Sequence, residues 1–241
     1  MAGPKHSNEG ASIPIIYEDN HLLVVEKPVN MLSQADDSRD PDILSVLKED
    51  IKRRYGKPGN VYLGLVHRLD RPVGGVMVFA KTSKAASRLS DAIRTRHFDK
   101  TYLAVVHTKP KEKHATLKHY LLKDPKTNMV SVVSPKVNGA KEAILDYQTL
   151  ASSEGLSLVQ VKLHTGRPHQ IRVQFAAIGC PLYGDQRYGA HLNTPGQQIA
   201  LWSNQIAFEH PTTKESLRFS SLPGEQHPWF LWSELIRNLA K

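Results

Sequence analysis

Apolar residues recur along the chain with two periods, and the shorter one predicts several β-strands. The run of four apolar residues at 22–25 predicts a buried strand that Pro28 ends. Residues 101–107 alternate, so Tyr102 and Leu103 are expected on opposite faces of a strand. Further strands are predicted over residues 61–66, 76–80, 144–150 and 156–163.

Apolar residues three or four positions apart predict four helices. The first begins with Asp40 as N-cap, the second is capped by Ser83, the third starts near Pro168 and the last opens at Pro228. The buried face of the second helix is expected to contain Ala85, Leu89 and Ile93. Several strands with few, scattered helices favour an α+β fold over regular βαβ winding.

The 241 residues are 40% hydrophobic, which is enough for a folded core. Residues 1–12 are polar and predict a loose tail, so the folded domain is expected to cover residues 13–241. No apolar run approaches the roughly 20 residues that cross a bilayer, and no secretory signal is evident, so no membrane partner is expected. Cys180 is the only cysteine, which favours a reducing cytoplasm.

The net charge of +9 favours a polyanionic partner such as a nucleic acid. Residues 109–123 carry five lysines and predict a basic loop or a surface hairpin. The 12 histidines and one cysteine show no zinc-binding spacing, and no phosphate-binding glycine loop is present. We therefore expect no zinc site.

Asp70 stands among three basic side chains in the run His67-Arg68-Leu69-Asp70-Arg71. Opposite charge nearby keeps a carboxylate ionised. Such a group can attack carbon, accept a proton or stabilise a cation. From composition alone, a structural cluster of salt bridges explains the same run equally well.

A second polar cluster covers residues 165–172. If a helix starts at Pro168, His169 and Arg172 share one face beside the buried row. An arginine in that position needs an anion, either a carboxylate such as Asp70 or a phosphate. A polar helix start at the surface is the alternative. Tyr102 is either a core residue, which the sequence alone favours, or a stacking platform for a base.

Three motifs in this order resemble the RluA-type family of RNA pseudouridine synthases. Residues 64–76 resemble the catalytic signature, whose aspartate falls on Asp70. Residues 100–106 resemble the strand whose tyrosine, here Tyr102, contacts the target base. Residues 166–172 resemble the motif whose last arginine, here Arg172, pairs with the aspartate. With matching stretches at 17–28, 181–185 and 208–211, the similarity runs from about residue 15 to residue 222.

The resemblance implies the pseudouridine synthase fold, with a mixed, largely antiparallel central sheet, flanking helices and a central RNA-binding cleft. It implies an enzyme that isomerises uridines in ribosomal or transfer RNA without cofactor or metal. The sequence leaves the oligomeric state open, and a monomer is the default expectation. Asp70 would be the nucleophile, Arg172 would hold it ionised, and Tyr102 would stack on the flipped base. Expected RNA contacts are His67, Arg68, Arg71, Arg167, His169 and Gln170.

The chain departs from the family pattern at two places. Val73-Gly74-Gly75 stands where the family often has Thr-Ser-Gly, and Leu201-Trp202-Ser203 stands where many members have Leu-His-Ala. The N-terminal RNA-binding domain of many relatives is also expected to be missing, so that target recognition rests on the catalytic domain or on a partner.

Two alternative functions can be distinguished from a pseudouridine synthase by the carboxylates that they require. A non-catalytic RNA-binding or ribosome-assembly protein would need the basic surface but not this carboxylate. A glycoside hydrolase would need a second carboxylate in a matching setting, which the sequence does not offer.

Overall fold

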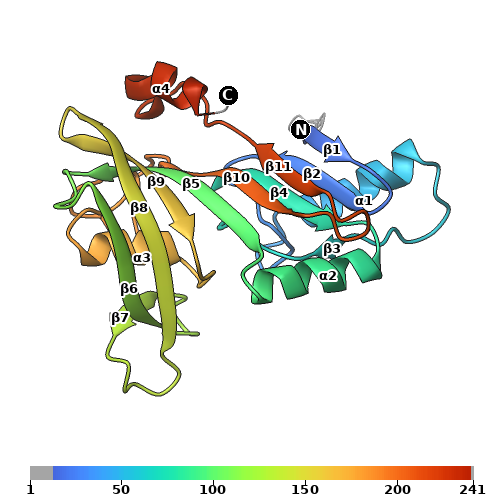
Figure 1. The fold of residues 1–241 in the computed structure, drawn as a ribbon, viewed down its shortest axis with the longest axis horizontal. Coiled ribbons are helices and arrows are strands. Elements are labelled where there is room, and N and C mark those ends of the chain that lie inside the picture. The colour runs from blue at the N-terminus through green and yellow to red at the C-terminus, as the bar shows by residue number, and fades with distance from the viewer. Residues whose placement is uncertain (1–12, 240–241) are drawn as a thin grey trace, which may run out of the picture.

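Eleven β-strands form one sheet that runs through the whole computed structural model, which describes residues 13–239 (Figure 1). The strand order is β1-β2-β4-β10-β5-β9-β8-β6-β7, with β3 added to β4 and β11 added to β10. Only the β4–β10 pair is parallel. The mixed, largely antiparallel sheet is thus confirmed, whereas the predicted tail at residues 1–12 lies outside the described residues. The strands are β1 (Ile15–Glu18), β2 (Leu22–Lys27), β3 (Gly64–Leu65), β4 (Gly74–Ala80), β5 (Phe98–His107), β6 (His114–Lys123), β7 (Val130–Val133), β8 (Lys141–Ser153), β9 (Leu156–Leu163), β10 (Leu201–Glu209) and β11 (Ser216–Ser220).

Helices pack on both faces of this sheet, so the α+β class is confirmed. They are α1 (Ile43–Arg54), α2 (Ser83–Arg94), α3 (Gln170–Ala177), the 3-10 helix η1 (Trp229–Trp232) and α4 (Ser233–Asn238). None of the helices between residues 13 and 239 has the length and apolar character that crossing a membrane requires.

Helices α1 and α3 begin later than predicted, whereas α2 begins one residue earlier. Asp42 rather than Asp40 caps α1, because its extended backbone lets the carboxylate accept a hydrogen bond from the Ser45 amide at 3.0 Å. Thr82 rather than Ser83 caps α2. Helix α3 starts at Gln170, two residues after Pro168, because His169 takes a left-handed conformation.

Residues 109–123 differ most from their prediction, because much of this segment is a regular strand. Strand β6 pairs with β8 on one side and β7 on the other. Its inward residues Leu117 and Leu121 are four apart, so polar residues hide the alternation in the sequence. The predicted strand at 61–66 is conversely reduced to Gly64–Leu65, which pairs only with the end of β4.

Strand β5 lies between the two halves of the sheet and carries the predicted tyrosine (Figure 1). Tyr102 faces the main core cluster, to which α1 and α3 contribute Leu47 and Phe175. Leu103 faces a different cluster, with Trp202 and η1. The predicted alternation along β5 is confirmed, and it directs Tyr102 to the side of the sheet where α3 begins.

Candidate active site

Asp70 lies in a tight turn between β3 and β4. Leu69 is buried, and Ser33 anchors its backbone: the Ser33 hydroxyl donates to the Leu69 carbonyl at 2.7 Å and accepts from the Leu69 amide at 3.1 Å. The Val73 amide donates to the Asp70 carbonyl at 3.0 Å. The Asp70 side chain remains 29% exposed. The turn therefore holds a solvent-accessible carboxylate on a fixed backbone.

The buried side chain of Lys27, on β2, supports the backbone of this turn. Its side chain is fully buried, and Nζ donates to the carbonyls of Pro28, Arg71 and Val73 at 2.9, 3.1 and 2.8 Å. Burial lowers the pKa of Lys27 to about 7, and the Asp70 carboxylate opposes that shift. Three carbonyl oxygens match the three N–H donors of an ammonium group, so the charged form ties the turn together.

Replacing Lys27 with Met is expected to lower the free energy of unfolding by about 3 kcal/mol, because three carbonyls lose their donor. Any catalysis by Asp70 should fall as well, since the Asp70 turn loses its support. Urea unfolding and an activity assay check both effects. The exposed Lys84→Met is the matched control. Equal stability of the two variants would show that Lys27 does not hold the turn.

Arg172 joins Asp70 to a second carboxylate. Its Nη1 donates to Asp70 Oδ2 at 3.1 Å, while Nε and Nη2 each donate to one oxygen of Asp185 at 2.8 Å. The Arg172 side chain is 8% exposed and that of Asp185 is fully buried. Burial alone would raise the pKa of Asp185, but Arg172 and the backbone amides of Arg187 and Tyr188 together outweigh it, so the pKa is lowered. Two acids therefore fix the guanidinium from both ends.

Tyr102 is buried on the face of β5 that is turned toward α3, and it lies close enough to Asp70 for the carboxylate to act on it electrostatically. Burial raises the pKa of its phenol well above the usual range, and the Asp70 carboxylate adds to the increase. The hydroxyl therefore keeps its proton at neutral pH. It can donate a hydrogen bond, but it is a poor base.

Asp70 Oδ1 differs from Oδ2 in its surroundings. Oδ2 accepts a hydrogen bond from Arg172 Nη1 at 3.1 Å and lies 3.9 Å from His169 Nε2. Within residues 13–239, no hydrogen bond to the other oxygen is formed. The arrangement thus leaves one oxygen of an ionised, positioned carboxylate free for a bond to an electrophilic carbon.

Three of the predicted RNA contacts lie at or near the surface. Arg68 is exposed. Arg71 is half-exposed and pairs with Asp40 at 2.6 Å. Arg167 donates from Nε to the Glu142 carbonyl at 2.8 Å and remains partly exposed. Their contact with RNA stays a prediction.

His67 and Gln170 do not have the free side chains that an RNA contact needs. His67 Nε2 accepts from the Val78 amide at 3.1 Å, and its Nδ1 is buried without a partner among the described residues. Gln170 is 3% exposed; its Oε1 accepts from Thr165 Oγ1 and its Nε2 donates to the Ile144 carbonyl. We correct the expectation for both residues: they brace the backbone around the site.

The His67 ring, whose Nδ1 is buried, predicts a dependence of stability on pH. Burial lowers the pKa of His67 to about 3, and Lys100 adds to the shift. In the unfolded chain the ring titrates near pH 6.5, so the unfolded state binds the extra proton first and stability falls as the pH drops below 6.5. At pH 5 this residue alone should cost about 2 kcal/mol. Urea unfolding at pH 7 and pH 5 should show a smaller loss in His67→Gln; equal losses would contradict the prediction.

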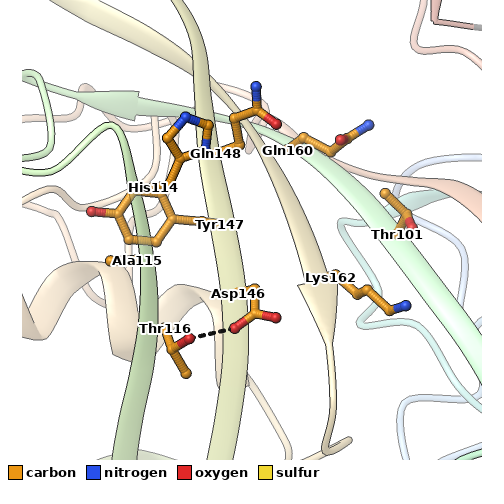
Figure 2. Close-up of a pocket in the computed structure, with 9 residues that line it drawn as sticks. All are labelled: Thr101, His114, Ala115, Thr116, Asp146, Tyr147, Gln148, Gln160 and Lys162. Atoms are coloured by element: carbon orange, nitrogen blue, oxygen red, sulfur yellow. Dashed lines mark hydrogen bonds between the residues drawn. The ribbon is translucent and has the colours of Figure 1, made fainter.

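A hollow of about 440 Å³ on the sheet surface is separate from these residues. Thr101, Lys162, Asp146 and Thr116 lie side by side in the strand register, each one position away from the row that contains Tyr102. Because side chains alternate along strands, they point to the opposite face of the sheet. Figure 2 shows this polar row, in which the Thr116 hydroxyl donates to Asp146. The hollow contains none of the three predicted catalytic residues.

Lys27, Asp185 and Tyr188 lie at the site but were not predicted from the sequence. A signal for Lys27 existed: it follows Leu23 and Val25 at two-residue spacing on the buried side of β2, where an unpaired lysine is costly. Asp185 and Tyr188 lie in an irregular segment, and no periodic pattern links them to Arg172. No group of three metal-binding side chains is found in residues 13–239.

Comparison with known proteins supports the resemblance. Residues 21–177 match the family model described as RNA pseudouridylate synthase. The uncharacterized RNA pseudouridine synthase YhcT of Bacillus subtilis is 33% identical over 86% of this chain and 67% of its own length. Ribosomal large subunit pseudouridine synthase C of Rickettsia bellii is 32% identical over 80% of this chain and 62% of its own length. The chain thus spans about two thirds of the length of these relatives.

A solved structure shares the fold. Human RNA Pseudouridylate Synthase Domain Containing 4 superposes with a TM-score of 0.73, covering 93% of each chain at 21% identity. The family match covers more than half of the sequence, and it includes Asp70, Tyr102 and Arg172. The chain therefore belongs to the RNA pseudouridylate synthase family.

Proposed function

We propose that this chain converts uridine to pseudouridine in RNA, with Asp70 as the nucleophile. The observation that carries the proposal is the asymmetry of the Asp70 carboxylate. Arg172 holds Oδ2, whereas Oδ1 has no hydrogen bond within residues 13–239 and the side chain is partly exposed. A structural ion pair would gain from having both oxygens bonded, so the free oxygen favours a chemical role.

The reaction breaks the bond between uracil N1 and ribose C1′, turns the base, and joins C5 to C1′ with loss of the C5 proton. Asp70 would attack either the ribose carbon or the uracil ring through its free oxygen. A base in a stack hides both reacting atoms, so it must flip out at a cost of a few kcal/mol. Tyr102, buried beside Asp70, would contact the flipped base and would do so with its hydroxyl protonated.

Ribosomal RNA is the first substrate class to test, because a relative carries the name of a ribosomal large subunit enzyme. Transfer RNA is the second. Arg68, Arg71 and Arg167 would bind phosphates, which implies affinity that falls steeply with salt. We further propose a monomer that acts in the cytoplasm, with the catalytic domain extending over residues 13–241.

RNA that carries tritium on uracil C5 tests the activity, since formation of the new carbon bond expels that hydrogen. Purified protein should release label from ribosomal RNA transcripts or from transfer RNA. Binding of both RNAs without release of label would instead support the non-catalytic RNA-binding function. Pseudouridine maps of cells with and without the gene would then identify the modified uridine.

A further inference from the structure

His169 has an unusual backbone at the point where α3 begins. Its φ and ψ are 51° and 19°, in the left-handed region, and its side chain forms no capping bond to the helix. A residue with a Cβ is strained there, by about 1 kcal/mol or more. This conformation accompanies a mostly buried imidazole, 11% exposed, whose Nε2 is 3.9 Å from Asp70 Oδ2.

The other ring nitrogen of His169, Nδ1, contacts the hydroxyl of Tyr188, which has one further hydrogen-bond partner among the described residues. Tyr188 Oη accepts from the Val130 amide at 3.0 Å and lies 2.7 Å from His169 Nδ1. The hydroxyl has one proton to donate, and among residues 13–239 His169 Nδ1 is the one group within hydrogen-bond distance that can accept it, so we infer that Tyr188 donates to Nδ1. Nδ1 is then unprotonated, so a neutral ring carries its proton on Nε2, on the side of Asp70.

Charged groups around His169 act in both directions. Burial lowers the pKa of the imidazole; Asp70 and Asp185 oppose this shift, whereas Arg172 and Arg187 add to it. The net shift is downward, which favours the neutral ring at pH 7. Tyr188 is held in place by Arg172, whose guanidinium carbon lies 5.2 Å from the centre of the tyrosine ring.

We propose that His169 positions Asp70, and that Tyr188 sets the tautomer that allows it to do so. This inference rests on the proposed function and replaces the RNA contact that the sequence predicts for His169. Arg172 and the Nε2–H of His169 approach the same carboxylate oxygen, so Oδ1 is the one presented to the substrate. The 3.9 Å separation exceeds a hydrogen bond in the free protein, and such contacts shorten when a substrate fills the site.

The nitrogen NMR signals of the His169 ring test the tautomer directly in the wild-type protein, assigned through its backbone. At pH 7.5 we expect Nδ1 without a proton and Nε2 with one. In Tyr188→Phe the ring should become a mixture of the two neutral tautomers, whereas Tyr62→Phe, which alters an exposed tyrosine, should change nothing. A wild-type ring protonated on Nδ1 would overturn the proposal.

Separate measurement of kcat and KM distinguishes a positioning role of His169 from an RNA contact. Asparagine tolerates the left-handed backbone, so His169→Asn should fold. We expect a loss of kcat on the order of 10- to 100-fold, with KM changed by less than about twofold. Tyr188→Phe should lower kcat in the same way but less. A rise in KM with unchanged kcat would make His169 an RNA contact and overturn the proposal.

The Asp70→Asn variant, assayed alongside, distinguishes a failure of the positioning role of His169 from a failure of the nucleophile assignment. If Asp70→Asn is inactive but His169→Asn changes only KM, the positioning role fails and the proposed function stands. If Asp70→Asn keeps wild-type activity, Asp70 is not the nucleophile, and the nucleophile assignment in the proposed function fails together with the positioning role of His169.

Discussion

Arg172→Lys is expected to reduce pseudouridine formation by on the order of 100-fold while RNA binding changes little. The guanidinium bonds Asp70 with one nitrogen and Asp185 with two others. An ammonium group is a compact charge without this planar fork, so it cannot hold both carboxylates in the same geometry. Because Arg172 is almost fully buried, it offers little surface to a phosphate. Single-turnover kinetics and an RNA-binding titration measure the two effects separately.

Arg94→Lys is the matched control, because Arg94 also pairs with an aspartate but is 74% exposed. It should leave both rate and affinity unchanged. If Arg172→Lys weakens RNA binding as much as it slows turnover, Arg172 is a phosphate anchor and not a partner of Asp70.

Gly74→Ser should destabilise this protein by about 3 kcal/mol, although the family often has serine at this position. Gly74 is paired with Trp202 across the parallel β4–β10 contact, and an added Cβ would overlap the indole ring, with Cη2 at 2.9 Å. The ring cannot move easily: it is 8% exposed, packs near Trp229 and donates from Nε1 to Ser221. Urea unfolding measures the loss.

The two departures from the family pattern therefore compensate each other. Trp202 stands where many members have a smaller histidine, so Trp202→His should make room for a side chain at position 74. The double variant Gly74→Ser/Trp202→His should lose at least about 1.5 kcal/mol less than the sum of the single variants. Strict additivity would show that the two positions are independent.

The elements that could be predicted from the sequence are those with a clear apolar period. Strands β2 and β5 and helix α2 lie where the pattern puts them, because each buries a continuous row of side chains. Strand β6 could not be predicted, since few of its residues are buried and it is held by its pairing with β7 and β8 rather than by an apolar period of its own. Helix α3 starts late because its first residues serve the site and His169 is strained.

Local motifs predicted part of the site. The order of three motifs indicated that Asp70 and Arg172 come together, and their 3.1 Å contact agrees with that. Lys27 supports the Asp70 turn from far away in the sequence, and Asp185 lies in an irregular segment 13 residues after Arg172, so neither stands out in the sequence. Burial of Gln170 likewise depends on Ile144, 26 residues away, so a surface role seemed equally reasonable.

Asp70→Asn is the variant that tests the nucleophile most directly. The amide is nearly the same size as the carboxylate, can still accept a hydrogen bond from Arg172, and lacks the charge needed for attack. With RNA tritiated at uracil C5, wild-type protein should release label and Asp70→Asn should release none above background, while both bind the RNA equally well. Release from Asp70→Asn at the wild-type rate would show that Asp70 is not the nucleophile.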